Sequence, residues 1–92
     1  MEFEWDPEKA RSNLSKHGVT FEDATFGWDD PLHLSRLESV TDGEERWLAM
    51  GTVGSILLLV VIYTERGSDA IRIISARRAE KHERRRYEQE NS

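Results

Sequence analysis

The stretch Ile56–Thr64, with the sequence ILLLVVIYT, decides the fold class of this chain. Apolar residues fill the run almost without interruption, and many of them are β-branched. This composition is typical of a strand that is buried on both faces of a sheet. The run is also far shorter than the ~20 residues that a membrane-spanning helix needs. We therefore expect a central strand and no insertion into a membrane.

Alternating apolar and polar residues on both sides of this run predict neighbouring strands. Short segments that contain glycine separate these runs and indicate tight turns. The expected strands are Leu32–Leu37, Glu45–Gly51, Ile56–Thr64 and Ala70–Arg77, with turns at Thr41–Gly43, Val53–Ser55 and Arg66–Asp69. Four successive strands with short connections predict an antiparallel arrangement.

Helices are predicted at both ends of the chain. Asp6-Pro7 is a strong helix start, and Gly18 is a typical helix end. Thr20–Asp23 has the spacing of a capping box and begins a second, shorter helix, while Arg78–Glu90 forms the last one. With a short strand at Phe3–Trp5, the order is β-α-α-β-β-β-β-α. We expect one α+β domain over residues 1–92, with an antiparallel sheet, two N-terminal helices and one C-terminal helix.

The charge of the chain is unevenly distributed. The net charge is −5, but residues 1–46 carry −7 and residues 47–92 carry +2. Within Arg66–Arg86 there are eight basic and three acidic residues. A polyanion is therefore able to meet a basic C-terminal surface although the chain as a whole is acidic. The alternative is a solvated helix face whose charges are paired.

Two motifs resemble those of the BrnT family, whose members are toxins with a RelE-like fold. The first comprises Trp5-Asp6, Lys9, Asn13, Lys16-His17-Gly18-Val19, Phe21 and Ala24, and the second comprises Arg72–Arg77, Ala79, Glu83-Arg84 and Tyr87. The resemblance implies an endoribonuclease that needs no metal and arrests growth. It also implies a BrnA-type antitoxin, which neutralises the toxin and represses the operon by binding operator DNA.

The residues present suit RNA cleavage without a metal ion. Such cleavage needs groups that transfer protons, for which His, Glu, Lys and Tyr serve, and cations that stabilise the charged phosphate. The sequence has no cysteine, no HExxH motif and no calcium-loop pattern, so neither a metal site nor a cofactor is predicted.

Six residues are predicted to be catalytic, and five of them have a structural alternative. They are Arg77, His17, Arg46, Lys16, Tyr87 and Glu83, and we assign Arg72, Arg78 and Lys81 to RNA binding. Ion pairs are the alternative for the arginines, an ordinary helix ending for Lys16-His17, and packing of the last helix for Tyr87. Strict alternation along Ala70–Arg77 places Arg72 and Arg77 on opposite faces.

The sequence leaves two other function classes open. One is a non-catalytic module that uses the basic C-terminal strand and helix to bind nucleic acid or an acidic protein, and the other is a structural subunit of a repressor complex. For the toxin hypothesis we expect a heterotetramer of two toxin and two antitoxin chains, in which the antitoxin covers Arg72–Tyr87. The acidic N-terminus lacks the apolar core of a secretory signal, so we expect a cytoplasmic protein.

Overall fold

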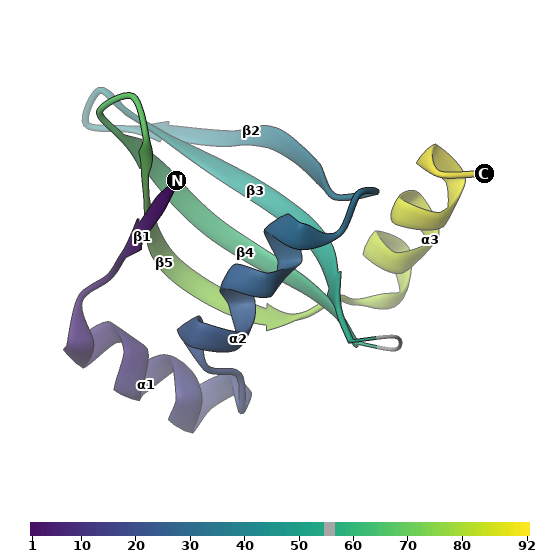
Figure 1. The fold of residues 1–92 in the computed structure, drawn as a ribbon, viewed down its shortest axis with the longest axis horizontal. Coiled ribbons are helices and arrows are strands. Elements are labelled where there is room, and N and C mark those ends of the chain that lie inside the picture. Colours follow the sequence, from purple (N-terminus) through teal and green to yellow (C-terminus); the bar gives the residue numbers. More distant parts are fainter. Residues whose placement is uncertain (55–56) are drawn as a thin grey trace.

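A five-stranded sheet forms the centre of the computed structural model, which describes residues 1–54 and 57–92. Two helices and a short 3₁₀ helix lie on one face of the sheet, and the last helix lies at its end (Figure 1). The strands are β1 (Glu2–Glu4), β2 (Leu34–Thr41), β3 (Glu44–Val53), β4 (Leu57–Arg66) and β5 (Ala70–Arg78), and the helices are α1 (Pro7–His17), α2 (Phe21–Thr25), the 3₁₀ helix η1 (Phe26–Asp29) and α3 (Lys81–Glu90).

The strand order is β1-β5-β4-β3-β2, so the apolar strand β4 is central, as predicted. Strands β2 to β5 are antiparallel to their neighbours, also as predicted. The exception is β1, which pairs in parallel with β5 and makes the sheet mixed. The predicted turn at Val53–Ser55 includes Gly54, while Ser55 and Ile56 lie outside the described residues.

The helices begin and end where their capping residues are. Asp6 accepts a hydrogen bond from the Glu8 backbone N–H at 2.9 Å, and Gly18 ends α1 with a left-handed φ of 69°. Thr20 accepts from the Asp23 backbone N–H at 3.0 Å and caps α2. The last helix begins at Lys81 rather than at Arg78, because Arg78 is still paired with Leu59 in the sheet.

Apolar side chains form a cluster on each face of the sheet. The larger cluster lies under α1 and α2 and includes Phe21, Leu59 and Ile73. The smaller cluster lies on the opposite face and consists of Leu48, Met50, Leu58 and Val60, with Tyr87 of α3 packed against it. Because both faces of β4 are buried, its continuous apolar sequence is explained.

A β-bulge in β5 overturns one prediction. Ile62 is paired with Ser75 and Tyr63 with Ile73, so Ile74 has no partner on β4. The extra residue shifts the alternation by one position beyond the bulge. Arg72 and Arg77 therefore point to the same face of the sheet, and the prediction of opposite faces was wrong because it assumed an unbroken period of two.

Candidate functional site

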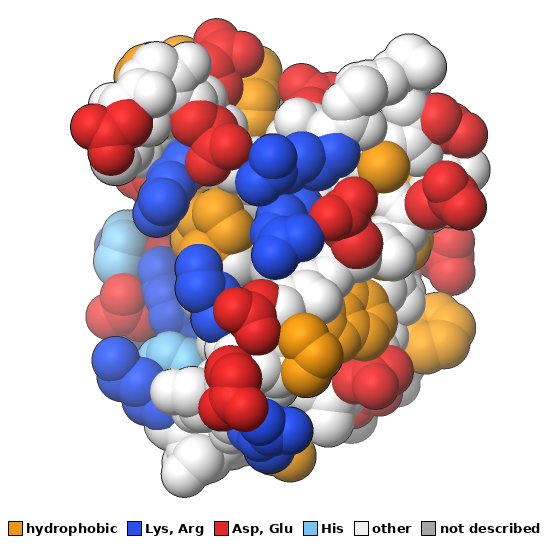
Figure 2. Space-filling view, turned by 90° about the vertical axis from the view of Figure 1, so that its left-hand side faces the viewer, with side chains coloured by type: hydrophobic (Ala, Val, Ile, Leu, Met, Phe, Trp, Pro, Cys, Tyr) orange, Lys and Arg blue, Asp and Glu red, His pale blue; other side chains and the backbone are white. Residues whose placement is uncertain are grey.

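Five arginines lie on the face of the sheet opposite α1 and α2, which we call the open face. Cross-strand partners point to the same face, so the register assigns each strand residue to one side. Seen from the end that carries β1, Lys and Arg side chains gather across the centre and left of the surface, with acidic side chains among them (Figure 2). The open-face arginines are Arg36, Arg46, Arg66, Arg72 and Arg77.

Four of these arginines have a carboxylate partner. The pairs are Arg36–Glu38 at 4.0 Å, Arg66–Glu44 at 3.5 Å, Arg72–Glu4 at 2.7 Å and Arg77–Glu83 at 2.7 Å. Arg46 differs from them, because the described part of the chain places no carboxylate within 4.0 Å of it and its buried Nε has no hydrogen-bond acceptor there. Arg46 is thus the open-face arginine that forms no ion pair within the described part of the chain.

Arg77 and Glu83 form a two-pronged ion pair at the start of α3. The two guanidinium N–H groups donate to the two carboxylate oxygens at 2.7 and 2.8 Å. Glu83 is only 8% exposed and also accepts the Glu80 backbone N–H at 2.9 Å, which completes a capping box. The hydrogen bond from Arg77 lowers the pKa of Glu83 and raises that of Arg77. Both side chains therefore hold α3 against the end of β5.

Tyr87, a predicted catalytic residue, is engaged by a carboxylate. Its hydroxyl donates to Oδ2 of Asp30 at 2.5 Å, and burial together with this bond raises the pKa of the tyrosine. Asp30 also accepts the backbone N–H and the hydroxyl of Thr52, each at 2.9 Å. Tyr87 and Glu83 share the face of α3 that meets the sheet, and both contacts fix this helix in place.

A groove between α1 and β5 brings together a second group of cations. Lys16 and His17 come from the last turn of α1, and Lys9 lies two turns earlier on the same helix. Across the groove lie the bulge residue Ile74 and Ser75, two positions before Arg77. His17 is half-buried, whereas the two lysines are exposed. The groove residues are Lys9, Ser12, Asn13, Lys16, His17, Ile74 and Ser75.

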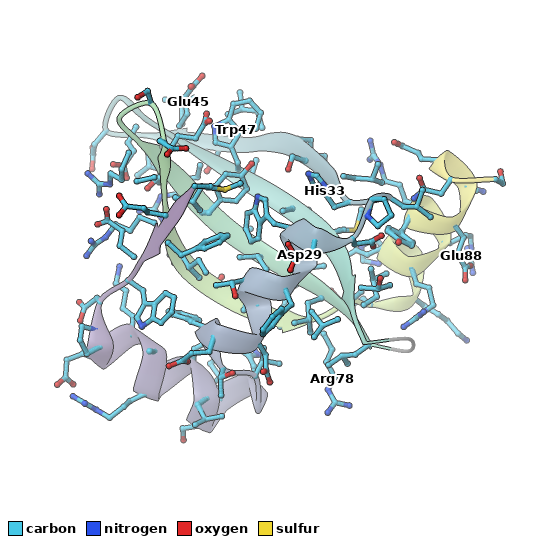
Figure 3. All side chains as sticks on the ribbon, in the orientation of Figure 1. Asp29, His33, Glu45, Trp47, Arg78 and Glu88 are labelled. Carbon is cyan, nitrogen blue, oxygen red and sulfur yellow. The ribbon has the colours of Figure 1, made fainter. Side chains whose placement is uncertain are left out.

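The three residues predicted to bind RNA lie apart from one another. Arg72 is on the open face, where Glu4 of β1 holds its guanidinium. Arg78 is exposed at the end of β5 and extends away from the body of the protein (Figure 3). Lys81 is exposed in the first turn of α3. The fold therefore does not gather these three cations into one site.

The first turn of α3 carries the residues with the best spacing for a metal ion. Potential ligand atoms of Glu80, His82 and Glu83 lie within 4.8 Å of one another. Both oxygens of Glu83 are already bound by Arg77, and one of them also accepts the Glu80 backbone N–H. A metal ion at this position would have to displace the ion pair that anchors α3.

Comparison with known proteins assigns the chain to a family. The model of the family described as "Ribonuclease toxin, BrnT, of type II toxin-antitoxin system" matches residues 5–83. The chain belongs to the BrnT family of ribonuclease toxins. The crystal structure of the Brucella abortus ribonuclease toxin BrnT is similar, with 28% sequence identity and a TM-score of 0.66 over 88% of this chain and 99% of that one. No curated protein matches the chain.

Two buried polar residues of this BrnT chain, Asn13 and Asp30, had no role predicted from the sequence. Asn13, part of the first motif, bonds through its side chain to the backbone of Ala76. Asp30 links the segment before β2 to β3 and α3. An Asp before proline signals a turn, which accounts for the bond from the Leu32 N–H but not for the distant partners. Those partners, Thr52 and Tyr87, are 22 and 57 positions away from Asp30, so no local sequence pattern predicts them.

Across the described residues, no helix is long and apolar enough to cross a membrane.

Proposed function

We propose that this toxin cleaves RNA by metal-independent acid–base chemistry in the groove between α1 and β5. The convergence of His17, Lys16 and Lys9 in one groove carries the proposal. Histidine is the side chain whose ordinary titration range suits proton transfer near neutral pH. The imidazole of His17 accepts the proton of the RNA 2′-hydroxyl, and the 2′-oxygen attacks the neighbouring phosphorus. The bond from phosphorus to the 5′-oxygen then breaks, and the ammonium group of Lys16 gives a proton to the leaving 5′-oxygen. The ammonium groups of Lys9 and Lys16 stabilise the negative charge that develops on the phosphorane.

In this mechanism the remaining predicted residues support the site. Arg77 and Glu83 are bound to each other, and Tyr87 is bound to Asp30, so none of the three is free to transfer a proton without breaking a contact. We propose that the Arg77–Glu83 pair holds α3 and the end of β5, next to the groove. The side chain of Arg77 is 33% exposed, so its charge also contributes to the attraction of RNA.

Cleavage of RNA in the presence of EDTA tests the mechanism. We expect products that end in 2′,3′-cyclic phosphate or 3′-phosphate, since the 2′-oxygen is the nucleophile. His17→Ala should lower the cleavage rate at least about a hundredfold, the usual contribution of a general base. His82→Ala serves as the matched control, because His82 is an exposed histidine outside the groove, and it should stay within about twofold of the parent.

Two results would contradict this mechanism. Loss of activity in EDTA, together with loss in His82→Ala, would favour a metal ion at the first turn of α3. Retention of RNA without cleavage by the unmodified chain would instead support a non-catalytic binding module.

We further propose that a BrnA-type antitoxin neutralises this chain and represses the operon through operator DNA. Membership of a type II toxin–antitoxin family supports an antitoxin partner and an RNA target. The basic surface around β5 and α3 supports an acidic antitoxin segment that excludes RNA. Two toxin chains and two antitoxin chains form the proposed complex, in the cytoplasm.

A further inference from the structure

The face of the sheet that carries α1 and α2, which we call the helix face, is uncovered at one end. The β2–β3 hairpin extends there beyond the helices (Figure 1). Two apolar side chains of β2 are exposed at this end, Leu37 at 44% and Val40 at 60%. The register places Leu37 opposite Trp47 and Val40 opposite Glu45, so these four residues share the helix face. Neighbouring apolar side chains that no helix covers are typical of a surface that contacts another molecule.

Carboxylates surround these apolar side chains. A hollow of about 520 Å³ has three glutamates in its wall and, among the described residues, no lysine or arginine. The residues that line it are Val40, Gly43, Glu44, Glu45, Trp47 and Glu65. Glu44 is paired with Arg66 at 3.5 Å, whereas neither Glu45 nor Glu65 forms an ion pair within the described part of the chain.

Glu45 and Glu65 are placed opposite each other on neighbouring strands. The register of β3 and β4, continued two steps beyond its last pair, brings Glu45 opposite Glu65. The ion pair of Glu44 with Arg66 lies one step further and agrees with this register. Like charges that are directly opposite in a sheet are destabilising. A cation placed between the two carboxylates removes this repulsion, so the pair is suited to a positively charged ligand.

We propose that this surface, which comprises Leu37, Val40, Glu45, Trp47 and Glu65 and which we call the hairpin surface, binds a basic segment of a partner protein. An apolar side chain of the segment packs on Val40 and Trp47, and a neighbouring lysine or arginine lies between the two glutamates. The apolar contact supplies most of the affinity, while the charges speed the encounter and fix the orientation. Nucleic acid is disfavoured at this surface because the carboxylates repel its phosphates.

Side chains rather than backbone groups carry this contact. Strand β2 lies at the edge of the sheet, but the bulge between Leu37 and Ser39 interrupts its ladder with β3. Bulges in edge strands hinder the addition of a further strand. The inferred segment therefore packs on the helix face and does not extend the sheet.

The hairpin surface is separate from the α1–β5 groove. The strand order β1-β5-β4-β3-β2 places the groove and the hairpin surface on opposite sides of the central strand. A partner on the hairpin surface leaves the groove open, and its basic charge distinguishes it from the acidic antitoxin segment proposed for β5 and α3. This inference does not depend on the proposed function.

Titration of the isotope-labelled protein with two short basic peptides, followed by NMR, tests the inference. One peptide consists of lysine and arginine with a central leucine, and the other has serine in place of the leucine. We expect shift changes concentrated at Val40 and Glu44–Trp47, and an affinity at least about threefold higher for the leucine peptide. Glu45→Gln should weaken the binding of both peptides about two- to fivefold at low salt. Val40→Ser should weaken the binding of the leucine peptide alone.

Matched controls separate the hairpin surface from general attraction of cations to an acidic protein. Glu88 is an exposed glutamate of α3 that lies far from Glu45 (Figure 3), and Leu14 is a 47% exposed leucine of α1. Glu88→Gln and Leu14→Ser should bind both peptides as the parent does. Equal weakening by Glu45→Gln and Glu88→Gln, or equal affinity of the parent for the two peptides, would overturn the inference.

Sedimentation of the protein alone distinguishes a separate partner from a second copy of this chain. We expect a monomer at low salt. Salt-sensitive self-association that Glu45→Gln abolishes would mean that basic residues of a second copy occupy the hairpin surface, and the inference of a separate basic partner would be wrong.

Discussion

Asp30 accepts hydrogen bonds from three separate parts of the chain. Its carboxylate receives the Tyr87 hydroxyl of α3, the Thr52 backbone N–H and hydroxyl of β3, and the Leu32 backbone N–H. Burial raises the pKa of this carboxyl group, but the four hydrogen bonds outweigh burial and lower the pKa to about 2. The charged form is therefore the one that the fold stabilises.

The low pKa of Asp30 predicts an acid-sensitive contribution to stability. Because the folded-state pKa lies below the ordinary value of 3.8, the stabilisation is complete above about pH 4 and disappears as the pH falls towards 2. Over this range the parent should lose about 1–2 kcal/mol more unfolding free energy than Asp30→Asn. Urea titrations of both proteins at pH 5 and pH 2 measure the difference, and identical losses would show that Asp30 is not the group responsible.

The side chain of Asn13 attaches helix α1 to the edge of strand β5. Strand β1 pairs only with Ala70–Arg72, so it does not cover the rest of that edge. Asn13 of α1 donates to the Ala76 carbonyl at 2.8 Å and accepts the Ala76 N–H at 3.1 Å, as a neighbouring strand residue would. It also donates to the Val19 carbonyl at 3.0 Å. Asn13 also lines the groove that holds His17.

Asn13→Ala should therefore destabilise the protein strongly. The change leaves the buried Ala76 N–H and two carbonyl groups unpaired, which should lower the unfolding free energy by about 2–4 kcal/mol. Ser15→Ala, on the exposed side of the same helix, should change it by less than about 0.5 kcal/mol. Chemical denaturation of the two variants measures both values. Similar small losses in both would mean that apolar packing alone holds α1 on the sheet.

The net charge of the molecule differs between the two halves of its sequence. Residues 1–46 have a net charge of −7. The segment Arg66–Arg86, which runs from the end of β4 through β5 into α3, has eight basic and three acidic residues. An acidic antitoxin segment would be guided to the basic side, and apolar anchors would supply most of its affinity. Val40 on β2 is an exposed apolar residue, but it lies beside Glu44 and Glu45, whose negative charge does not favour an acidic partner.

We therefore expect the antitoxin to protect Arg72–Tyr87 from hydrogen exchange. Comparison of the free toxin with its complex should show slower exchange in β5 and α3, and the mass of the complex should correspond to two copies of each chain. Protection confined to residues 1–40, with β5 and α3 unchanged, would contradict this mode of neutralisation and would require inhibition through a distant surface.

The elements that depend on local interactions could be predicted from the sequence. Asp6-Pro7 and Gly18 set the ends of α1 because capping involves backbone groups only a few residues away. The apolar run in β4 determined the central strand because burial on both faces requires such a composition. The motifs around Lys16-His17 and Arg72–Arg77 were likewise enough to indicate the toxin family.

The contacts between charged residues depend on long-range packing and could not be predicted from the sequence. The bulge at Ile74 placed Arg72 and Arg77 on one face, and it results from pairing with β4 rather than from any local pattern. The pairing of Arg77 with Glu83, and the lack of a carboxylate within 4.0 Å of Arg46 among the described residues, also depend on strand register and helix packing. The register of neighbouring strands is set by packing between segments that are distant in the sequence. The alternation of apolar and polar residues and the composition of each segment therefore do not predict which charged residues meet.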